Sequence, residues 1–583
     1  MPHRAHLFSL RMAHAFREAC IDEPYRGRRF LRDVMAGLTV GIIAIPLAMA
    51  LAIASGVAPQ YGLYTAIIAG FVIALTGGSR FSISGPTAAF VVILYPIAQS
   101  YGLGGLLLAT LMSGVLLILM ALMRLGRFIE YIPESVTLGF TGGIAVVIAT
   151  LQIRDFLGLQ VSDMPEHYWD KLALLTGALP EFDGMSTLVA GVTLACMLLW
   201  PRLKTPVPPH LPAVVIGSLL ALWLNAQGAA IDTIGSRFSY LLPDGTEGAG
   251  IPPFLPEFAW PWQQAGASGE PVGLSWSLVR DLLPAAFAIA MLGAIESLLC
   301  AVVLDGMTGK RHSANSELMG QGLGNIITPF FGGITATAAI ARSAANYRAG
   351  AESPVSAMVH SLVVLLALVS LAGLLAYLPM PAMAALLVMV AWNMSEAPKS
   401  LHLLKTAPRS DILVFLTCFS LTVLLDMVIA ITTGVLLAAV LFMREMAQMT
   451  RVTDITQSKR IAESRLPDGW QVFKINGPLF FAAADRIFGE LAVLARNARG
   501  FILYMDGVTI LDAGGLSALN KLIATCERDG TQIVIADLQF QPLRTLARAG
   551  VAPIAGVSRY TSSLDEALRL ISCPASETDR ASG

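Results

Sequence analysis

The sequence predicts an α-helical membrane protein of fourteen segments in a seven-plus-seven inverted repeat, followed by a small C-terminal α/β domain. Three observations predict this fold. First, 55% of the 583 residues are hydrophobic and only 14% are charged, whereas soluble domains are about 25% charged. Second, apolar segments long enough to span or half-span a bilayer recur in a regular order. Third, short strand patterns alternate with helical patterns after Arg444, which indicates a soluble domain.

The apolar segments form two sets of seven. We place them at about 34–54, 62–77, 86–98, 104–123, 132–151, 186–200 and 211–226, and then at about 281–303, 316–331, 337–347, 355–377, 381–396, 411–426 and 428–443. The third member of each set is short and follows a run of glycine, serine and threonine. Because each half has an odd number of spans, the second half is inverted relative to the first, as in many transporters.

Basic residues give the orientation in the membrane. The first apolar segment directly follows Arg26, Arg28, Arg29 and Arg32, so the positive-inside rule makes residues 1–33 a cytoplasmic segment. This segment lacks the apolar core and cleavage site of a signal peptide. The two longest loops, at about 152–185 and 227–280, then lie outside. Their lysines and arginines are Arg154, Lys171, Arg237 and Arg280.

Two stretches resemble interrupted membrane helices, one in each half of the chain. They are residues 82–90 and residues 331–343, and both are rich in glycine, serine and threonine. Backbone leaves helical geometry inside a bilayer only where it lines a cavity or is buried in protein. Two half-helices that begin there would point their positive N-terminal ends at one anion site. The alternative is a pair of ordinary helix contacts built from small residues.

Two charged residues lie at membrane depth, where a charge is costly and indicates a function or a partner. Arg342 follows the second break, and Glu296 lies in an apolar segment without a basic neighbour. Arg342 either pairs with Glu296 or contributes positive potential to the anion site, and the two roles are compatible. Glu296 is either a carboxyl group hydrogen-bonded across helices or a proton-coupling group. Asp426, at the end of a predicted helix, is the next candidate for coupling.

The C-terminal part has the pattern of a small α/β domain. Strand patterns at 471–481, 501–506 and 532–537 alternate with helical patterns at about 483–498, 513–528 and 541–549. We therefore expect a membrane transport domain at 34–447, with repeats at about 34–226 and 281–443. The soluble domain is expected at 455–572 and a disordered tail at 573–583.

Other functions are not indicated by the sequence. The net charge of −1 argues against a nucleic-acid partner. The six cysteines are scattered without the spacing of a zinc site or a disulfide framework, so we expect no metal and no cofactor. No G-x-x-x-x-G-K-[ST] run is present, which argues against direct use of ATP. His210, His312, His360 and His402 lie far apart, with no nearby serine or cysteine partner at a nucleophile turn, so we do not expect an enzyme.

Three motifs resemble the SulP/SLC26 family of anion transporters. They are the run from Gly41 to Tyr64, the stretch from Ser84 to Ala89 and the tail motif from Leu511 to Leu516. The resemblance covers about residues 25–570. Within the family, the chain is most similar to the DauA-type aerobic C4-dicarboxylate transporters of Gram-negative bacteria. That closeness rests on residues 293–309, 315–318 and 342–346.

The resemblance implies a core and a gate domain, a C-terminal STAS domain and a homodimer. It also implies a substrate site lined by Pro46, Thr87, Ala88, Phe90, Ala341, Arg342 and Ser343. It further implies that Glu296 faces this site and couples transport to protons. Pro46 is equally compatible with a simple helix kink.

The tail motif departs from the regulatory pattern of STAS domains. Where signalling members have a phosphorylatable serine or threonine, this chain has Ala513, and Ser517 is not the matching position. We therefore expect the domain to have a structural or trafficking role, or to dock a cytoplasmic protein, rather than to act as a phosphoswitch.

These patterns predict a multi-pass transporter in the bacterial inner membrane with both termini in the cytoplasm. The expected activity is proton symport of small anions, with C4-dicarboxylates such as succinate, fumarate and aspartate as substrates. A sulfate or bicarbonate transporter on the same scaffold is the alternative within this class. A membrane sensor or scaffold that signals through its STAS domain is the alternative from another class.

Overall fold

The chain packs as two compact units, Met1–Val435 and Leu436–Gly583, which are described separately. The computed structural model describes residues 12–127, 132–161, 164–165, 167–203, 205, 207–242, 246–425, 427–462, 466–494 and 498–572. Asp426 and the expected tail at 573–583 lie outside the described residues. The expected domain boundaries stay predictions.

The first half of the membrane unit contains six long helices. They are α3 (Gly27–Ala54), α4 (Pro59–Thr76), α5 (Ala88–Leu122), α6 (Glu134–Leu157), α8 (Gly184–Leu199) and α9 (His210–Ala226). Helix α5 contains two of the predicted segments, because its backbone leaves helical geometry at Gly102, where φ is +67°. The shorter elements of this half and of the following loop are α2 (His14–Arg17), α7 (Tyr168–Ala178), α10 (Ile234–Arg237), β2 (Ser239–Leu241) and β3 (Glu247–Ala249).

The second half contains the other seven segments. They are α11 (Trp276–Thr308), α12 (Ala314–Ile327), α13 (Ile340–Arg348), α14 (Val355–Leu375), α15 (Met380–Met394), α17 (Arg409–Leu424) and α18 (Met427–Met449). A short helix that the sequence did not reveal, α16 (Ala397–Thr406), lies between α15 and α17. Nine helices in the described part of the chain are long and apolar enough to cross a membrane. With α5 counted as two segments, the helices of the two halves correspond to the fourteen predicted segments. The predicted fold class is confirmed.

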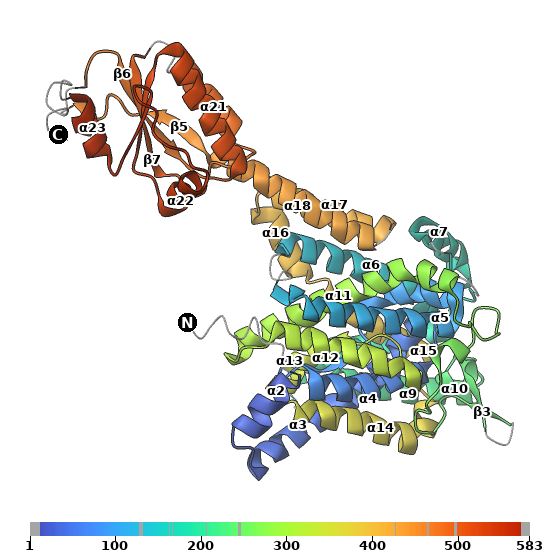
Figure 1. Ribbon diagram of the computed structural model, residues 1–583. Helices are drawn as coiled ribbons and strands as arrows, with labels where there is room; N and C mark the ends of the chain where they lie inside the picture. Colours follow the sequence, from blue (N-terminus) through green and yellow to red (C-terminus); the bar gives the residue numbers. More distant parts are fainter. Residues whose placement is uncertain are drawn as a thin grey trace. The chain divides into compact units, whose positions relative to one another are not determined.

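The packing repeats itself between the two halves, as an inverted repeat requires. Figure 1 shows α4, α5, α12 and α14 lying alongside one another. The first segment of each half packs on the fourth segment of the other half, in the pairs α3–α14 and α11–α5. The fifth segment of each half likewise packs on the sixth segment of the other half, in the pairs α6–α17 and α15–α8.

Small residues allow the closest of these contacts. Gly114 of α5 and Gly322 of α12 face each other so closely that a Cβ on either would lie 2.8 Å from the carbonyl oxygen of the other. Membrane helices associate by such close packing, because lipid provides no hydrophobic driving force between them.

Both predicted breaks are non-helical, and they pair with each other. Strand β1 (Ser84–Gly85) precedes α5, and strand β4 (Thr337–Ala338) precedes α13. The two strands are antiparallel, with Ser84 opposite Ala338 and Gly85 opposite Thr337. The ladder satisfies backbone groups that have left the helices and lie away from water. It also places the start of α5 next to the start of α13.

The second unit contains a five-stranded sheet in the order β5-β6-β7-β8-β9. Its strands are β5 (Arg451–Asp454), β6 (Trp470–Asn476), β7 (Gly500–Gly507), β8 (Gln532–Ala536) and β9 (Ser558–Thr561). Strand β5 is antiparallel to β6, and the remaining pairs are parallel. The helices are α19 (Lys459–Ala462), α20 (Ala484–Leu494), α21 (Ala513–Asp529), α22 (Phe540–Arg548) and α23 (Leu564–Ser572).

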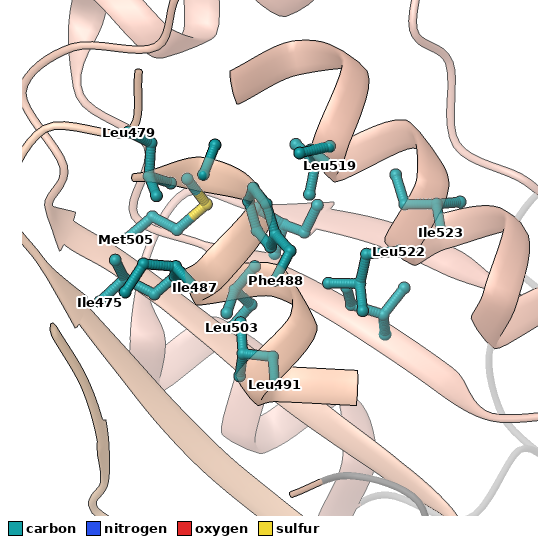
Figure 2. Packing of buried hydrophobic residues seen from close by; sticks show 14 of the residues in the cluster. Ile475, Leu479, Ile487, Phe488, Leu491, Leu503, Met505, Leu519, Leu522 and Ile523 are labelled. Carbon is teal, nitrogen blue, oxygen red and sulfur yellow. The ribbon is translucent and has the colours of Figure 1, made fainter. Parts of the chain in front are cut away.

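Apolar side chains of β7 point alternately to the two faces of this sheet, and both faces are buried. Leu503 and Met505 face α20 and α21, where they pack with Phe488 and Leu522, and Figure 2 shows this cluster. Ile502 points to the other face and packs with residues of α23. Because successive side chains of a strand point to opposite faces, this pattern gives the unit two apolar layers. The predicted α/β domain is confirmed.

Candidate functional site

The candidate site is built where α5 and α13 begin. Gly85 precedes Pro86, which disfavours helical backbone at the preceding residue, so α5 begins only after Thr87. The backbone N–H of Ala339 donates to Ile83 O at 3.0 Å. The N–H of Ile83 donates to Ser343 Oγ at 2.9 Å. Ser343, one of the predicted site residues, therefore helps to hold the two breaks together.

Arg342 reaches from the second break to the first. Its side chain is only 4% exposed, and Nη2 donates to Pro86 O at 2.7 Å. A Cβ on Gly85 would lie 3.0 Å from Nη1, so glycine leaves the room that the guanidinium occupies. Nε and Nη1 are buried without a hydrogen-bond partner. Since a guanidinium has five N–H donors in a fixed plane, Arg342 retains donors for a ligand.

Glu296 lies on α11 and also contacts the first break. The hydroxyl of Thr87 donates to Glu296 Oε2 at 3.0 Å, and the side chain is partly exposed. Arg342 and Glu296 are both described residues, and no ion pair within 4.0 Å joins them. The alternative in which the two side chains pair directly is therefore not the arrangement seen here. Each instead contacts one of two consecutive residues, Pro86 and Thr87.

The other predicted site residues, apart from Ser343, are apolar. Ala88 is the first residue of α5, and Phe90 is buried at 1% exposure. The Phe90 ring packs toward α11, 3.5 Å from where Gly293 would carry a Cβ. Pro46 is buried in the middle of α3, a helix that contacts both α5 and α13. Ala341 is exposed at the start of α13.

A polar stripe on α12 supports the breaks, and the sequence interpretation did not assign it. Glu317 Oε2 accepts hydrogen bonds from the backbone N–H groups of residues 78 and 79, both at 2.9 Å. Gln321 Nε2 donates to Ser84 Oγ at 3.1 Å. Asn325 both accepts from Ala336 N at 2.8 Å and donates to Ala336 O at 3.0 Å. Because these three residues recur every fourth position, they share one helix face. This spacing of polar residues within an apolar segment is the sequence pattern from which the stripe could have been predicted.

Two of the hollows in the membrane unit are lined by helices that carry predicted site residues. The larger, of about 620 Å³, lies between α11 and the start of α6 and is lined by Thr137, Ile295 and Leu299 among others. Leu299 is one helical turn from Glu296. The smaller hollow, of about 230 Å³, lies between α3 and α5 on one side and α6 and α15 on the other. In the described part of the chain, no group of three or more histidine, cysteine or acidic residues is placed to hold a metal ion.

Comparison with known proteins gives a match over nearly the whole chain. The model of the sulfate permease family matches residues 30–418, and the STAS domain model matches residues 462–567. A Bacillus subtilis (strain 168) protein named "Putative sulfate transporter YvdB" is 38% identical over 543 residues, which are 93% of this chain and 98% of that protein. The bicarbonate transporter BicA of Picosynechococcus sp. is 29% identical and covers 79% of this chain and 81% of its own.

Two solved structures are similar in fold. The transmembrane domain of a cyanobacterial bicarbonate transporter BicA is 28% identical, with a TM-score of 0.59, and the match covers 70% of this chain and 98% of that one. Murine Slc26a9, an anion transporter in the inward-facing state, is 18% identical with a TM-score of 0.82. That match covers 97% of this chain and 95% of the murine chain, so the likeness in fold includes both units.

Proposed function

The chain belongs to the sulfate permease family of membrane anion transporters and has a C-terminal STAS domain, and from this premise we propose that it takes up a small oxyanion together with protons. The first candidates are C4-dicarboxylates such as succinate, fumarate and aspartate, as the DauA-type motifs indicate. Transport is secondary, driven by ion gradients rather than by ATP.

The observation that carries this proposal is the buried guanidinium of Arg342 with two unpartnered nitrogens. It lies where the first turns of two half-helices meet, and the N–H groups of a first helical turn have no partner within the helix. An anion there would gain the dipole ends of α5 and α13 as well as charge-assisted hydrogen bonds from Arg342. A carboxylate accepts two parallel bonds from a guanidinium, so one end of a dicarboxylate fits this donor set.

Glu296 supplies the proton-coupling step of the proposal. As a carboxylate it accepts a hydrogen bond from Thr87, and as a carboxylic acid it can donate one in return. Thr87 directly precedes the first turn of α5, so the protonation state of Glu296 changes the start of the half-helix that faces the anion. A proton on Glu296 also removes a negative charge that would repel the substrate. Binding of anion and proton would therefore favour each other.

Sulfate is the second candidate substrate and bicarbonate the third. The names of the Bacillus subtilis relative and of BicA refer to these anions. One arginine with two helix N-termini suits a compact dianion as well as a dicarboxylate, because all three donors converge on a small volume. The sensor alternative lacks support of this kind, since Ala513 replaces the residue that a phosphoswitch needs.

We place the protein in a bacterial inner membrane as a homodimer with both termini in the cytoplasm. The transport domain extends over 34–447 and the STAS domain over 455–572. The basic residues of the N-terminal segment and short loops support this orientation. A cytoplasmic protein that docks on the STAS domain is a further partner in this proposal.

Uptake into proteoliposomes tests the proposal directly. Purified protein is reconstituted, and uptake of labelled succinate, sulfate and bicarbonate is measured with and without an imposed inward proton gradient. We expect one of the three to accumulate, and accumulation to collapse when a protonophore removes the gradient. Protein-free vesicles measure leakage. Absence of uptake for all three anions, with correctly oriented folded protein, would refute the transport proposal.

A further inference from the structure

The smaller hollow continues the faces of α3 and α5 that carry predicted site residues. On α3 it is lined by Ala50 and Ala54, which follow Pro46 by one and two helical turns. On α5 it is lined by Tyr95 and Gln99, which lie on the same helix face as Ala88. Residues spaced by one or two turns share a face of a helix. The hollow therefore lies on the line that leads from the candidate site along both helices.

The opposite wall of this hollow carries the charges. It includes Gln152, Arg154 and Asp155 at the end of α6, and Arg237, the last residue of α10. Arg237 Nη1 lies 2.6 Å from Asp155 Oδ1, so these two charges neutralise each other. Arg154 is partly buried, and no ion pair or side-chain hydrogen bond is found for it among the described residues. The described residues that line the hollow therefore carry one positive charge without an ionic partner, that of Arg154.

The position of this charge in the chain is informative. The two long loops expected from the sequence, at about 152–185 and 227–280, contain four lysines and arginines, Arg154, Lys171, Arg237 and Arg280, and two of these four line the hollow. In the proposed orientation this hollow opens to the outside, and the larger hollow beside Glu296 opens to the cytoplasm. A cavity with low-dielectric walls and one sign of charge raises the local concentration of the opposite ion.

We propose that Arg154 forms an outer capture site for the anion, at the entrance of the path that leads to Arg342. The inference rests on the proposed function and orientation. Its ligand class is that of the transported substrate, a small oxyanion, which Arg154 would hold with the amide groups of Gln99 and Gln152. Capture there would raise the rate at which substrate reaches the central site from outside and would leave the later steps unchanged.

The first test measures the potential in the hollow without requiring transport. Gln99→Cys is treated in intact cells with two impermeant methanethiosulfonate reagents, one anionic (sulfonatoethyl) and one cationic (trimethylammonioethyl). The wild-type chain, with its native cysteines, is the blank. Adding Arg154→Gln should lower the ratio of anionic to cationic labelling rates by roughly fivefold, the combined effect on the two reagents of a unit charge about 9 Å away in water. Adding Arg154→Lys or Arg280→Gln should leave the ratio nearly unchanged.

The second test measures transport of whichever of succinate, sulfate or bicarbonate the wild-type protein takes up. Arg154→Gln should raise the KM for outside substrate several-fold with kcat retained, and Arg154→Lys should restore it. Arg280 is an exposed arginine that is expected on the same, outer side of the membrane as Arg154. The control variant Arg280→Gln should therefore have the KM of the wild type. The difference should shrink at high ionic strength, because salt screens the charge.

The outcomes separate this inference from the proposed function. An unchanged labelling ratio, or a Gln99→Cys that does not react from outside, overturns the capture site whether or not the protein transports. A changed ratio with an unchanged KM also overturns it, because the charge would then not act on substrate. Failure of the wild-type protein to transport any of the three anions refutes the proposed function, while the labelling ratio still decides whether Arg154 sets the potential of the hollow.

Discussion

Arg342 Nη2 donates a 2.7 Å hydrogen bond to the carbonyl oxygen of Pro86, which is 256 residues away in the sequence. The bond joins the break of one repeat to the break of the other. The next residue, Thr87, donates to Glu296. Arg342 and Glu296 therefore contact two residues that are neighbours in the sequence. Anything that displaces the start of α5 therefore acts on both charged groups.

Arg342→Ala should reduce transport far more than stability. Charge-assisted hydrogen bonds to an anion contribute about 1.5–3 kcal/mol each, so we expect kcat/KM to fall at least tenfold. Stability should change little, because removing a buried charge without an ionic partner also removes its desolvation cost. Initial uptake rates and thermal unfolding of the purified protein measure the two effects. Arg342→Lys keeps the charge but not the planar fork, so its kcat/KM should lie between those of Arg342→Ala and the wild type. Wild-type kinetics for Arg342→Ala would remove this residue from the site.

Glu296→Gln should abolish proton-driven accumulation while downhill anion exchange persists. Glutamine is similar in size and can still accept from Thr87, so the start of α5 should keep its position. It cannot take up or release a proton, so the pH dependence of uptake should flatten. Counterflow exchange and gradient-driven uptake at several pH values distinguish the two activities. If the variant accumulates substrate with the wild-type pH dependence, another group couples transport.

The sequence predicted the helices and breaks well because those features are local. An arginine or a glutamate in an apolar segment is conspicuous by itself, and so is a run such as Ser84–Gly85–Pro86. The roles of Gln321 and Asn325 were missed because Gln321 bonds the Ser84 hydroxyl and Asn325 bonds the backbone of Ala336, and only the fold brings these groups together. The short helix α16 was missed because its ten residues are too few and too polar for a membrane segment.

Direct pairing of Arg342 with Glu296 could not be decided from the sequence for a similar reason. Both residues were recognised as charges at membrane depth, but their separation depends on how α11 and α13 are rotated around the paired strands. The structure gives each a different partner at Pro86 and Thr87. Their roles in transport, and those of Pro46 and Ala341, stay predictions.

Gly322→Ala should destabilise the membrane unit. A Cβ at this position would lie 2.8 Å from Gly114 O and 3.0 Å from Ile118 N, and backbone atoms cannot move aside without shifting α5. Overpacking of this kind costs about 1–3 kcal/mol, so thermal unfolding in detergent should occur at a lower temperature. Gly191→Ala on α8 is the matched control, since nothing lies within 4 Å of its Cβ position. Equal melting temperatures for the two variants would contradict the packing assigned to Gly322.

The N-terminal segment should lose stability in acid through Glu23. A hydrogen bond from Arg80 is the main reason that the pKa of Glu23 falls from about 4.5 to about 2, and the Arg80 Nη2 to Glu23 Oε1 distance is 2.8 Å. Because the pKa is lower in the folded state, the stabilisation is complete above pH 4.5 and disappears as the pH falls toward 2. Glu23→Gln should therefore lower the unfolding temperature at pH 7, and its difference from wild type should narrow below pH 4.5. Glu270→Gln, an exposed control, should show neither effect.

Asp512 should be a structural residue of the STAS domain rather than part of a phosphoswitch. Its two carboxylate oxygens accept from Gly515 N at 2.8 Å and from Phe481 N at 3.1 Å, so it caps α21 and joins this cap to the segment between β6 and α20. Asp512→Ala should cost about 1 kcal/mol of STAS stability, as loss of a helix N-cap does, measured by urea unfolding of the purified protein. Ser517→Ala and Thr509→Ala change exposed side chains and should leave both stability and uptake unchanged. Stoichiometric phosphate on this loop in cells, together with altered uptake in these two alanine variants, would instead support the sensor alternative, because it would show that the domain signals without a residue at the position of Ala513.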